Sequence, residues 1–214
     1  MTCVEKLLSI SSEPLAHTPP ADPEQLEDYP LGPELLHMLE RKNGFYAFES
    51  ALHVFPLTSV PVNGSSLAEW NSDALWRNDY GDLTVGLLFF AENILQDQFC
   101  LSASGVLRFN AETGGTKPMA DSLESWAQVI LRDYDHETCW TLAHGWQAEN
   151  GPLPPGKRLM PKVPFFLGGA YSMENLWAGD AVEGMRFRAD LAIQTKNLPD
   201  GSRVRIVLGE KPPN

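Results

Sequence analysis

Four carboxylates of this sequence could together bind a hard divalent cation: Asp79, Asp82, Glu92 and Asp97. They flank the two ends of a nearly continuous apolar run from Leu83 to Ala91, and Mg²⁺ and Ca²⁺ prefer oxygen ligands of this kind. A metal-dependent hydrolase is therefore one function that these residue types allow. Nothing in their spacing fixes a ligand geometry, however, and Asp is favoured in turns for local hydrogen bonding alone. We assign no metal ligand, and the hydrolase stays an alternative.

A thiol and two imidazoles lie close together in the sequence, at Cys139, His136 and His144. A thiol beside an imidazole is the minimum for nucleophilic catalysis. On an ideal helix, however, the step from Cys139 to His144 turns the two side chains about 140° apart. The pair Gly168-Gly169 follows an apolar run but lacks the glycine pattern of a phosphate-binding loop. We expect no catalytic residue, no enzymatic activity and no cofactor.

The formal charge of −12 is unevenly distributed along the chain. Residues 1–150 contain 22 Asp and Glu against 7 Lys and Arg, whereas residues 151–214 contain 6 against 9. The acidic first part disfavours nucleic acid as a partner, because phosphate binding needs clustered basic residues. The same charge would steer a basic protein toward this one. An equally simple interpretation is that the charge only keeps the protein in solution.

Other features of the sequence are typical of a cytoplasmic protein. It has no run of about 18 apolar residues that could span a bilayer, and its first residues lack the basic and apolar regions of a signal peptide. The cysteines Cys3, Cys100 and Cys139 form no CxxC pair, which argues against a disulfide framework and a structural zinc site. We expect reduced thiols, a cytoplasmic location and no membrane partner.

Prolines divide the chain into a leading segment and one domain. The first 30 residues are interrupted by prolines so often that no long helix can pass through them. We expect residues 1–30 to be a proline-rich N-terminal segment with at most a short docking element. Residues 31–214 are then a single domain, since this length supports one substantial core.

Apolar spacing and capping residues predict five helices in this domain. The first begins at Leu31-Gly32-Pro33, with proline in the first turn, and ends at Asn43-Gly44. The second begins at Ser66, in a capping box, and continues to Trp76. The others begin at Asp121-Ser122, span residues 137–149, and run from Asp180 to the turn at Leu198-Pro199.

Strands are predicted around these helices, which makes the domain α+β. Leu83 to Ala91 is expected to be a central strand buried on both faces. A hairpin joins Gln98–Ser102 to Gly105–Asn110 through a short polar turn. Further extended segments are expected at Phe45–Phe55, Val163–Leu167 and Ser202–Leu208, and an irregular crossing follows Pro152.

The order of these segments resembles the SUKH superfamily, which includes the Smi- and Knr-type cell-wall-synthesis regulators and bacterial immunity proteins. The resemblance covers roughly residues 31–132 and is less clear after Pro152. It is carried by the following segments: Leu31-Gly32-Pro33, Asn43-Gly44-Phe45, Leu88 to Asn93, Phe99-Cys100-Leu101, Val106 to Phe109, and Ser122 to Trp126.

This resemblance implies a mixed, mostly antiparallel sheet with packed helices, and a function in binding other proteins. Many bacterial members look like immunity proteins that neutralise a toxin nuclease or deaminase, and the family offers no catalytic residues to transfer. We therefore expect a non-catalytic protein-binding module of the immunity or adaptor type. A regulatory scaffold of the cell-wall regulator type is a further alternative.

A partner-binding surface is expected where the acidic residues meet aromatic ones. Tryptophan is enriched at interface hot spots, and Trp76 directly precedes a polar turn. A partner such as a basic toxin domain would meet the carboxylates beside it. The candidate contacts are Trp76, Asp79, Tyr80, Asp82 and Asp97. The oligomeric state is left open.

Overall fold

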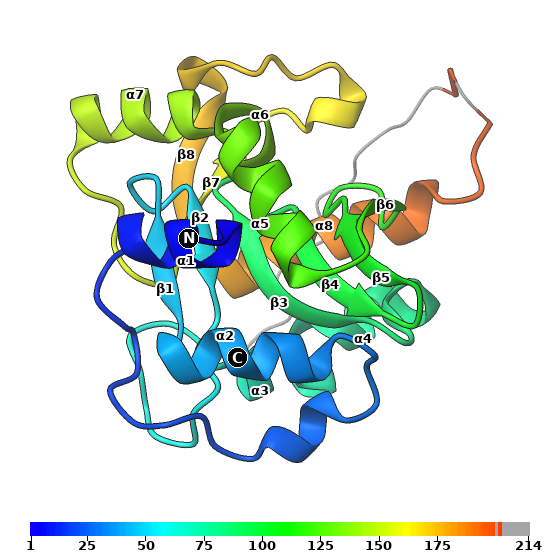
Figure 1. The fold of residues 1–214 in the computed structure, drawn as a ribbon. Coiled ribbons are helices and arrows are strands. Elements are labelled where there is room, and N and C mark those ends of the chain that lie inside the picture. The colour runs from blue at the N-terminus through cyan, green and yellow to red at the C-terminus, as the bar shows by residue number, and fades with distance from the viewer. Residues whose placement is uncertain (200, 203–214) are drawn as a thin grey trace.

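A six-stranded antiparallel sheet organises the chain in the computed structural model, which describes residues 1–199, 201 and 202 (Figure 1). The strands pair in the order in which they occur in the sequence. They are β1 (Phe45–Ala47), β2 (Leu52–Val54), β3 (Leu88–Asn93), β4 (Gln98–Ser102), β5 (Gly105–Phe109) and β6 (Thr116–Ala120). A second, two-stranded antiparallel sheet joins β7 (Lys157–Pro161) to β8 (Leu176–Asp180).

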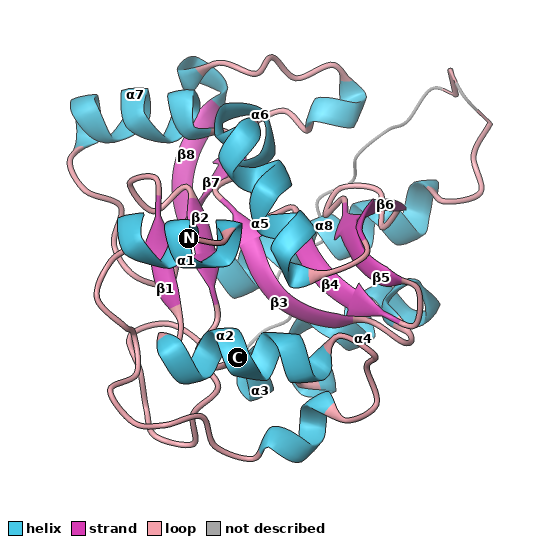
Figure 2. Ribbon diagram, viewed as in Figure 1, coloured by secondary structure: helices cyan, strands magenta, loops and turns pink. Residues whose placement is uncertain are grey.

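Helices surround the larger sheet and complete the predicted α+β fold (Figure 2). They are α1 (Cys3–Ile10), α2 (Gly32–Arg41), α3 (Leu67–Trp70), α4 (Asn78–Tyr80), α5 (Leu123–Arg132), α6 (Tyr134–Thr138), α7 (Trp140–Asn150) and α8 (Ala181–Thr195). None of the helices in the described part of the chain combines the length and the hydropathy that crossing a bilayer requires.

Local signals correctly place several of these elements. Ser66 and Ser122 cap α3 and α5 with reciprocal capping boxes, and the Asp180 carboxylate accepts backbone hydrogen bonds at the start of α8. The β4–β5 hairpin is also confirmed, with Ser102 opposite Gly105. Gly105 has a φ of 120°, and a Cβ there would lie 2.6 Å from the Ala120 carbonyl oxygen, so the turn requires glycine.

The predicted central strand begins later than expected. Residues Gly81–Thr84 form a 3₁₀ helix, Val85 is 76% exposed, and Gly86 turns the chain with a φ of 73°. Strand β3 then starts at Leu88, and all its residues are buried. The apolar run from Leu83 is therefore not one strand, because a left-handed glycine interrupts it.

Two predicted helices are broken. The helix from Ser66 ends at Trp70, because the Asn71 side chain hydrogen-bonds the backbone of β3 at Phe89, and a π-helical turn follows at Asp73–Arg77. The helix over residues 137–149 is split at Cys139, which has a left-handed φ of 57°. Each break therefore leaves two short helical segments in place of one longer helix.

The region after Pro152 also differs from the prediction. The expected irregular crossing contains β7, whereas the strand predicted at Val163–Leu167 is a 3₁₀ turn over Phe165–Leu167. Strand β6 was not predicted, because Pro118 lies within it and proline is depleted in strands. The strand predicted at Ser202–Leu208 lies outside the described residues, apart from Ser202.

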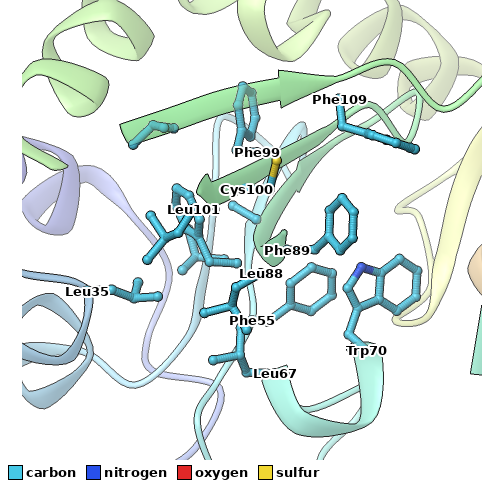
Figure 3. Close-up of a cluster of buried hydrophobic side chains, with 14 of the residues drawn as sticks. Leu35, Phe55, Leu67, Trp70, Leu88, Phe89, Phe99, Cys100, Leu101 and Phe109 are labelled. Carbon is cyan, nitrogen blue, oxygen red and sulfur yellow. The ribbon is translucent and has the colours of Figure 1, made fainter. Parts of the chain in front are cut away.

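The central strands β3 and β4 are buried on both faces, and successive side chains of β3 point to opposite sides of the sheet. Phe90 packs edge-to-face on Trp126 of α5, with the ring centroids 5.0 Å apart. Phe89 packs on the other face against Trp76, at 5.0 Å. Figure 3 shows Phe89 on the same side as Trp70, and Figure 1 shows α1 and α5 in front of the sheet and α8 behind it.

The proline-rich N-terminal segment is part of this core. Leu7 and Leu8 of α1 are buried within the main apolar cluster, and α1 packs against α5. The segment then runs beside β1, where the Ser12 N–H donates to the Tyr46 carbonyl oxygen (2.7 Å) and the Tyr46 N–H donates to the Ser12 hydroxyl (3.0 Å). Residues 1–30 therefore pack onto the domain that they precede.

Candidate partner-binding site

The two aromatic residues of the predicted surface lie in the core, which corrects that part of the prediction. Trp76 and Tyr80 are fully buried and pack edge-to-face on one another. The Tyr80 hydroxyl donates to the Ala111 carbonyl oxygen (2.6 Å), and burial raises its pKa. Neither side chain can contact a partner in this conformation, because each is enclosed by the sheet and the helices behind it.

The three carboxylates of the predicted surface separate into two places. Asp79 and Asp82 are exposed beside α8, where Asp79 lies 3.8 Å from the Arg186 guanidinium and Asp82 accepts a 2.9 Å hydrogen bond from Lys196. That hydrogen bond lowers the pKa of Asp82. Asp97 lies in the β3–β4 turn, where its side chain is largely buried against Arg108.

Arg108 holds two carboxylates at once at the end of the hairpin. Its Nε and Nη2 donate to Asp97 Oδ2 (3.2 and 2.9 Å), and its Nη1 donates to Glu137 Oε2 (3.0 Å). The Asp97 Oδ1 also accepts from the Ala111 N–H. All these bonds tie the β3–β4 turn to β5 and α6, so Asp97 has a structural role in positioning them.

Glu92, the remaining carboxylate of the acidic set, lies in a buried charged cluster. Its Oε1 accepts from Arg158 Nε (2.7 Å) and from His53 Nδ1 (3.1 Å), and its Oε2 accepts from Gln98 Nε2 (3.2 Å). Burial raises the pKa of Glu92, but the Arg158 charge and these hydrogen bonds outweigh it and lower the pKa. Burial lowers the pKa of His53 to about 4, so its imidazole is neutral and donates from Nδ1.

The four carboxylates therefore do not form a metal site. Each has its own cation as a partner, and the described residues contain no group of three or more His, Cys, Asp or Glu side chains placed to hold a metal ion.

The cysteine and histidines are no better placed for nucleophilic catalysis. His144 pairs with Glu49 (2.7 Å), while the Cys139 thiol faces the His136 carbonyl. Burial raises the pKa of Cys139 to about 12, which leaves almost no reactive thiolate at neutral pH.

An exposed aromatic residue lies elsewhere, on the second sheet. Of the six tryptophans, Trp177 of β8 is the one with a largely exposed side chain, at 47%. Phe187 of α8 is 40% exposed and lines the same groove. Single exposed apolar side chains are normal on a monomer, whereas exposed apolar side chains that gather in one patch mark candidate interfaces.

These two residues belong to a groove of about 430 Å³, here called the Trp177 groove. Its apolar walls come from β7, β8, α8 and the loop after β7, and a few charged side chains line it as well. Its residues are Met160, Pro161, Pro164, Trp177, Phe187 and Leu191, with Glu112, Lys162, Glu183 and Arg188. An apolar groove with a few polar groups is typical of a binding site.

The sequence around β8 explains why Trp177 lies at the surface. Leu176 and Gly179 are buried, and Trp177 and Asp180 are exposed. Trp177 pairs with Met160 of β7. A Cβ at Gly179 would meet the Met160 methyl group and the Trp177 ring, so only glycine leaves room for both side chains. Neither strand of this sheet was predicted, which is why the sequence pattern did not indicate this groove.

Comparison with known proteins supports the fold and leaves the function open. No family model and no curated protein matches this chain. Among solved structures, it is similar to the crystal structure of Atu4351 from Agrobacterium tumefaciens, with a TM-score of 0.54 and 11% sequence identity. The match covers 87% of this chain and 88% of that one. At this identity, the similarity concerns the fold alone.

Proposed function

We propose that this chain is a non-catalytic protein-binding module that holds its partner at the Trp177 groove. The exposed Trp177 in an apolar groove carries this proposal. Tryptophan is enriched among residues whose truncation costs most in binding, and such residues insert into apolar pockets at the centre of an interface. Phe187, on the facing helix, extends the same apolar surface.

The partner class follows from the charge and from the resemblance to the SUKH superfamily. An acidic chain, with a net charge of −12, is suited to a basic partner. We therefore favour an immunity-like or adaptor protein that neutralises a basic toxin nuclease or deaminase in the cytoplasm, because such a protein needs an acidic surface to attract its partner. A regulatory scaffold would use the same groove for a different partner, and the identity of the captured protein distinguishes the two. The hydrolase alternative gains no support from carboxylates that each pair with a separate cation.

A pair of surface variants tests the groove. Protein carrying Trp177→Ser is compared with wild type in a pull-down from cells that naturally produce it, and each recovered partner is then titrated by biolayer interferometry. Removing a hot-spot tryptophan is expected to weaken binding by about 30-fold, corresponding to about 2 kcal/mol, chiefly through faster dissociation.

Tyr171→Ser is the matched control, because Tyr171 is 66% exposed and lies outside the Trp177 groove. It should bind like wild type. An unchanged dissociation constant for Trp177→Ser would refute the proposed site. The electrostatic part is tested separately: the association rate should fall as salt rises from about 50 to about 500 mM, because salt screens exposed charges.

A further inference from the structure

Arg188 is a buried cation without an ion-pair partner among the described residues. Its side chain lines the Trp177 groove and is only 3% exposed. Nη1 donates a 2.6 Å hydrogen bond to the neutral Gln96 side chain, while Nη2 is buried and has no hydrogen-bond partner within the part of the chain that the structure describes. Buried charges in proteins are normally paired, so this guanidinium is an exception that calls for a reason.

The nearby carboxylates are all engaged by other groups. Three of them act electrostatically on the guanidinium: Glu112, Asp97 and Glu92. Asp97 pairs with Arg108, and Glu92 pairs with Arg158. The two oxygens of Glu112 accept the backbone N–H groups of two consecutive residues in the loop after β7, at 3.1 and 3.0 Å. None of the three accepts a hydrogen bond from Nη2, so the guanidinium charge is balanced only at a distance.

Stability does not explain this arrangement. Replacing buried ion pairs with well-packed apolar side chains is often neutral or stabilising, and an unsatisfied buried donor costs about 1–3 kcal/mol. Because Nη2 is already removed from water in the folded protein, an entering acceptor would gain a hydrogen bond without stripping water from this donor. A ligand group is therefore the partner that the orphan nitrogen lacks.

The surroundings of Arg188 restrict the chemistry of that group. Two cations line the groove, Arg188 and Lys162, together with two carboxylates that other groups engage. Glu112 accepts the two backbone N–H groups, and Glu183 lies 3.2 Å from Arg186. An anionic acceptor is therefore favoured over a neutral one. The apolar walls exclude a strongly hydrated anion such as phosphate, which needs several donors. A carboxylate attached to an apolar group satisfies both conditions.

We propose that the Trp177 groove binds an apolar segment of a partner protein whose carboxylate hydrogen-bonds to Nη2 of Arg188. This rests on the proposed function and adds the chemistry of the contact. An aromatic or aliphatic side chain packs on Trp177 and Phe187, and the neighbouring acidic side chain reaches the guanidinium. A partner that is basic as a whole can make this contact, because it needs only one acidic side chain in the segment that enters the groove.

Two capped peptides test the carboxylate directly and need no natural partner. The full-length protein is titrated with acetyl-Ala-Phe-Glu-Leu-Ala-amide and with the same peptide carrying Gln in place of Glu, and binding is followed by NMR. We expect the Glu peptide to bind wild type about tenfold more tightly, in line with a hydrogen bond between charged groups. Arg188→Met should remove this preference, whereas Arg132→Met, at an exposed position of α5 outside the groove, should retain it.

Equal affinity of the two peptides for wild type would overturn the proposal, and so would a preference that persists in Arg188→Met. Should Arg188→Met fail to fold, the Nη2 proton signals of wild-type Arg188 decide instead: they must shift with the Glu peptide and not with the Gln peptide. The outcome is separable from the test of function. Peptides that bind equally, and that both lose binding in Trp177→Ser, would refute the Arg188 contact and leave the groove itself in place.

Discussion

Replacing His53 with Gln should remove most of the dependence of stability on pH between neutral and mildly acidic conditions. His53 is buried, stacks on Tyr46 with the ring centroids 4.5 Å apart, and donates to Glu92. The Arg158 guanidinium binds the same carboxylate oxygen, so a second positive charge on His53 would lie beside an existing one. The neutral imidazole is therefore strongly preferred in the folded protein.

The size of the effect follows from the pKa. Burial lowers the pKa of His53 from 6.5 to about 4, and each unit corresponds to about 1.4 kcal/mol. Between these values the unfolded chain binds more protons than the folded protein, so the free energy of unfolding decreases as pH falls. The stabilisation is complete above pH 6.5. The loss amounts to about 2 kcal/mol from pH 7 to pH 5, and to about 3 kcal/mol in total.

Urea denaturation at pH 7, 6 and 5, followed by tryptophan fluorescence, measures this loss. His53→Gln keeps a donor for Glu92 but does not titrate, so its stability should change much less over this range. His37→Gln, on the exposed face of α2, is the matched control and should lose as much stability as wild type. Equal losses for wild type and His53→Gln would show that His53 is not the titrating group.

Two substitutions test the packing, and a labelling experiment tests the Cys139 thiol. Phe89→Ala should lower the free energy of unfolding by about 3–5 kcal/mol in urea denaturation, because Phe89 is fully buried. The control is Val85→Ala, at an exposed position, and a loss below about 1 kcal/mol for Phe89→Ala would contradict the burial. Gly32→Ala should cost about 1–3 kcal/mol by the same measurement, since its Cβ would lie 2.0 Å from the Leu26 carbonyl oxygen; wild-type stability would refute this close approach. Cys139 should resist iodoacetamide in the native protein and react after unfolding, as measured by mass spectrometry. If Cys139 of the native protein were labelled as fast as a free thiol, this would contradict the raised pKa of about 12.

Local signals predicted the elements whose ends are fixed by neighbouring residues. Ser66 and Ser122 satisfy backbone N–H groups within three positions, and the Gly105 turn closes a hairpin between adjacent strands. Such interactions depend little on the rest of the chain. They can therefore be inferred from sequence spacing alone.

The candidate site could not be inferred in this way, because exposure depends on contacts between distant segments. Trp76 and Trp177 each follow a leucine in the sequence, yet Trp76 is enclosed by Phe89 of β3 and Trp177 is at the surface of β8. The alternation of Leu176 and Trp177 is informative only once this segment is known to be a strand. The orphan nitrogen of Arg188 likewise results from the positions of carboxylates far away in sequence.

The contact between the N-terminal segment and β1 has a consequence for self-association. A sheet edge with free backbone groups can accept a strand from another molecule. At one edge, Lys117 and Pro118 of β6 discourage this, through charge and through a missing N–H. At the other edge, Ser12 occupies both outward backbone groups of Tyr46. The residues before the domain thus cover this edge of the sheet. Removing residues 1–12 would free the outward N–H and carbonyl groups of Tyr46, which could then pair with a strand of a second copy of the protein.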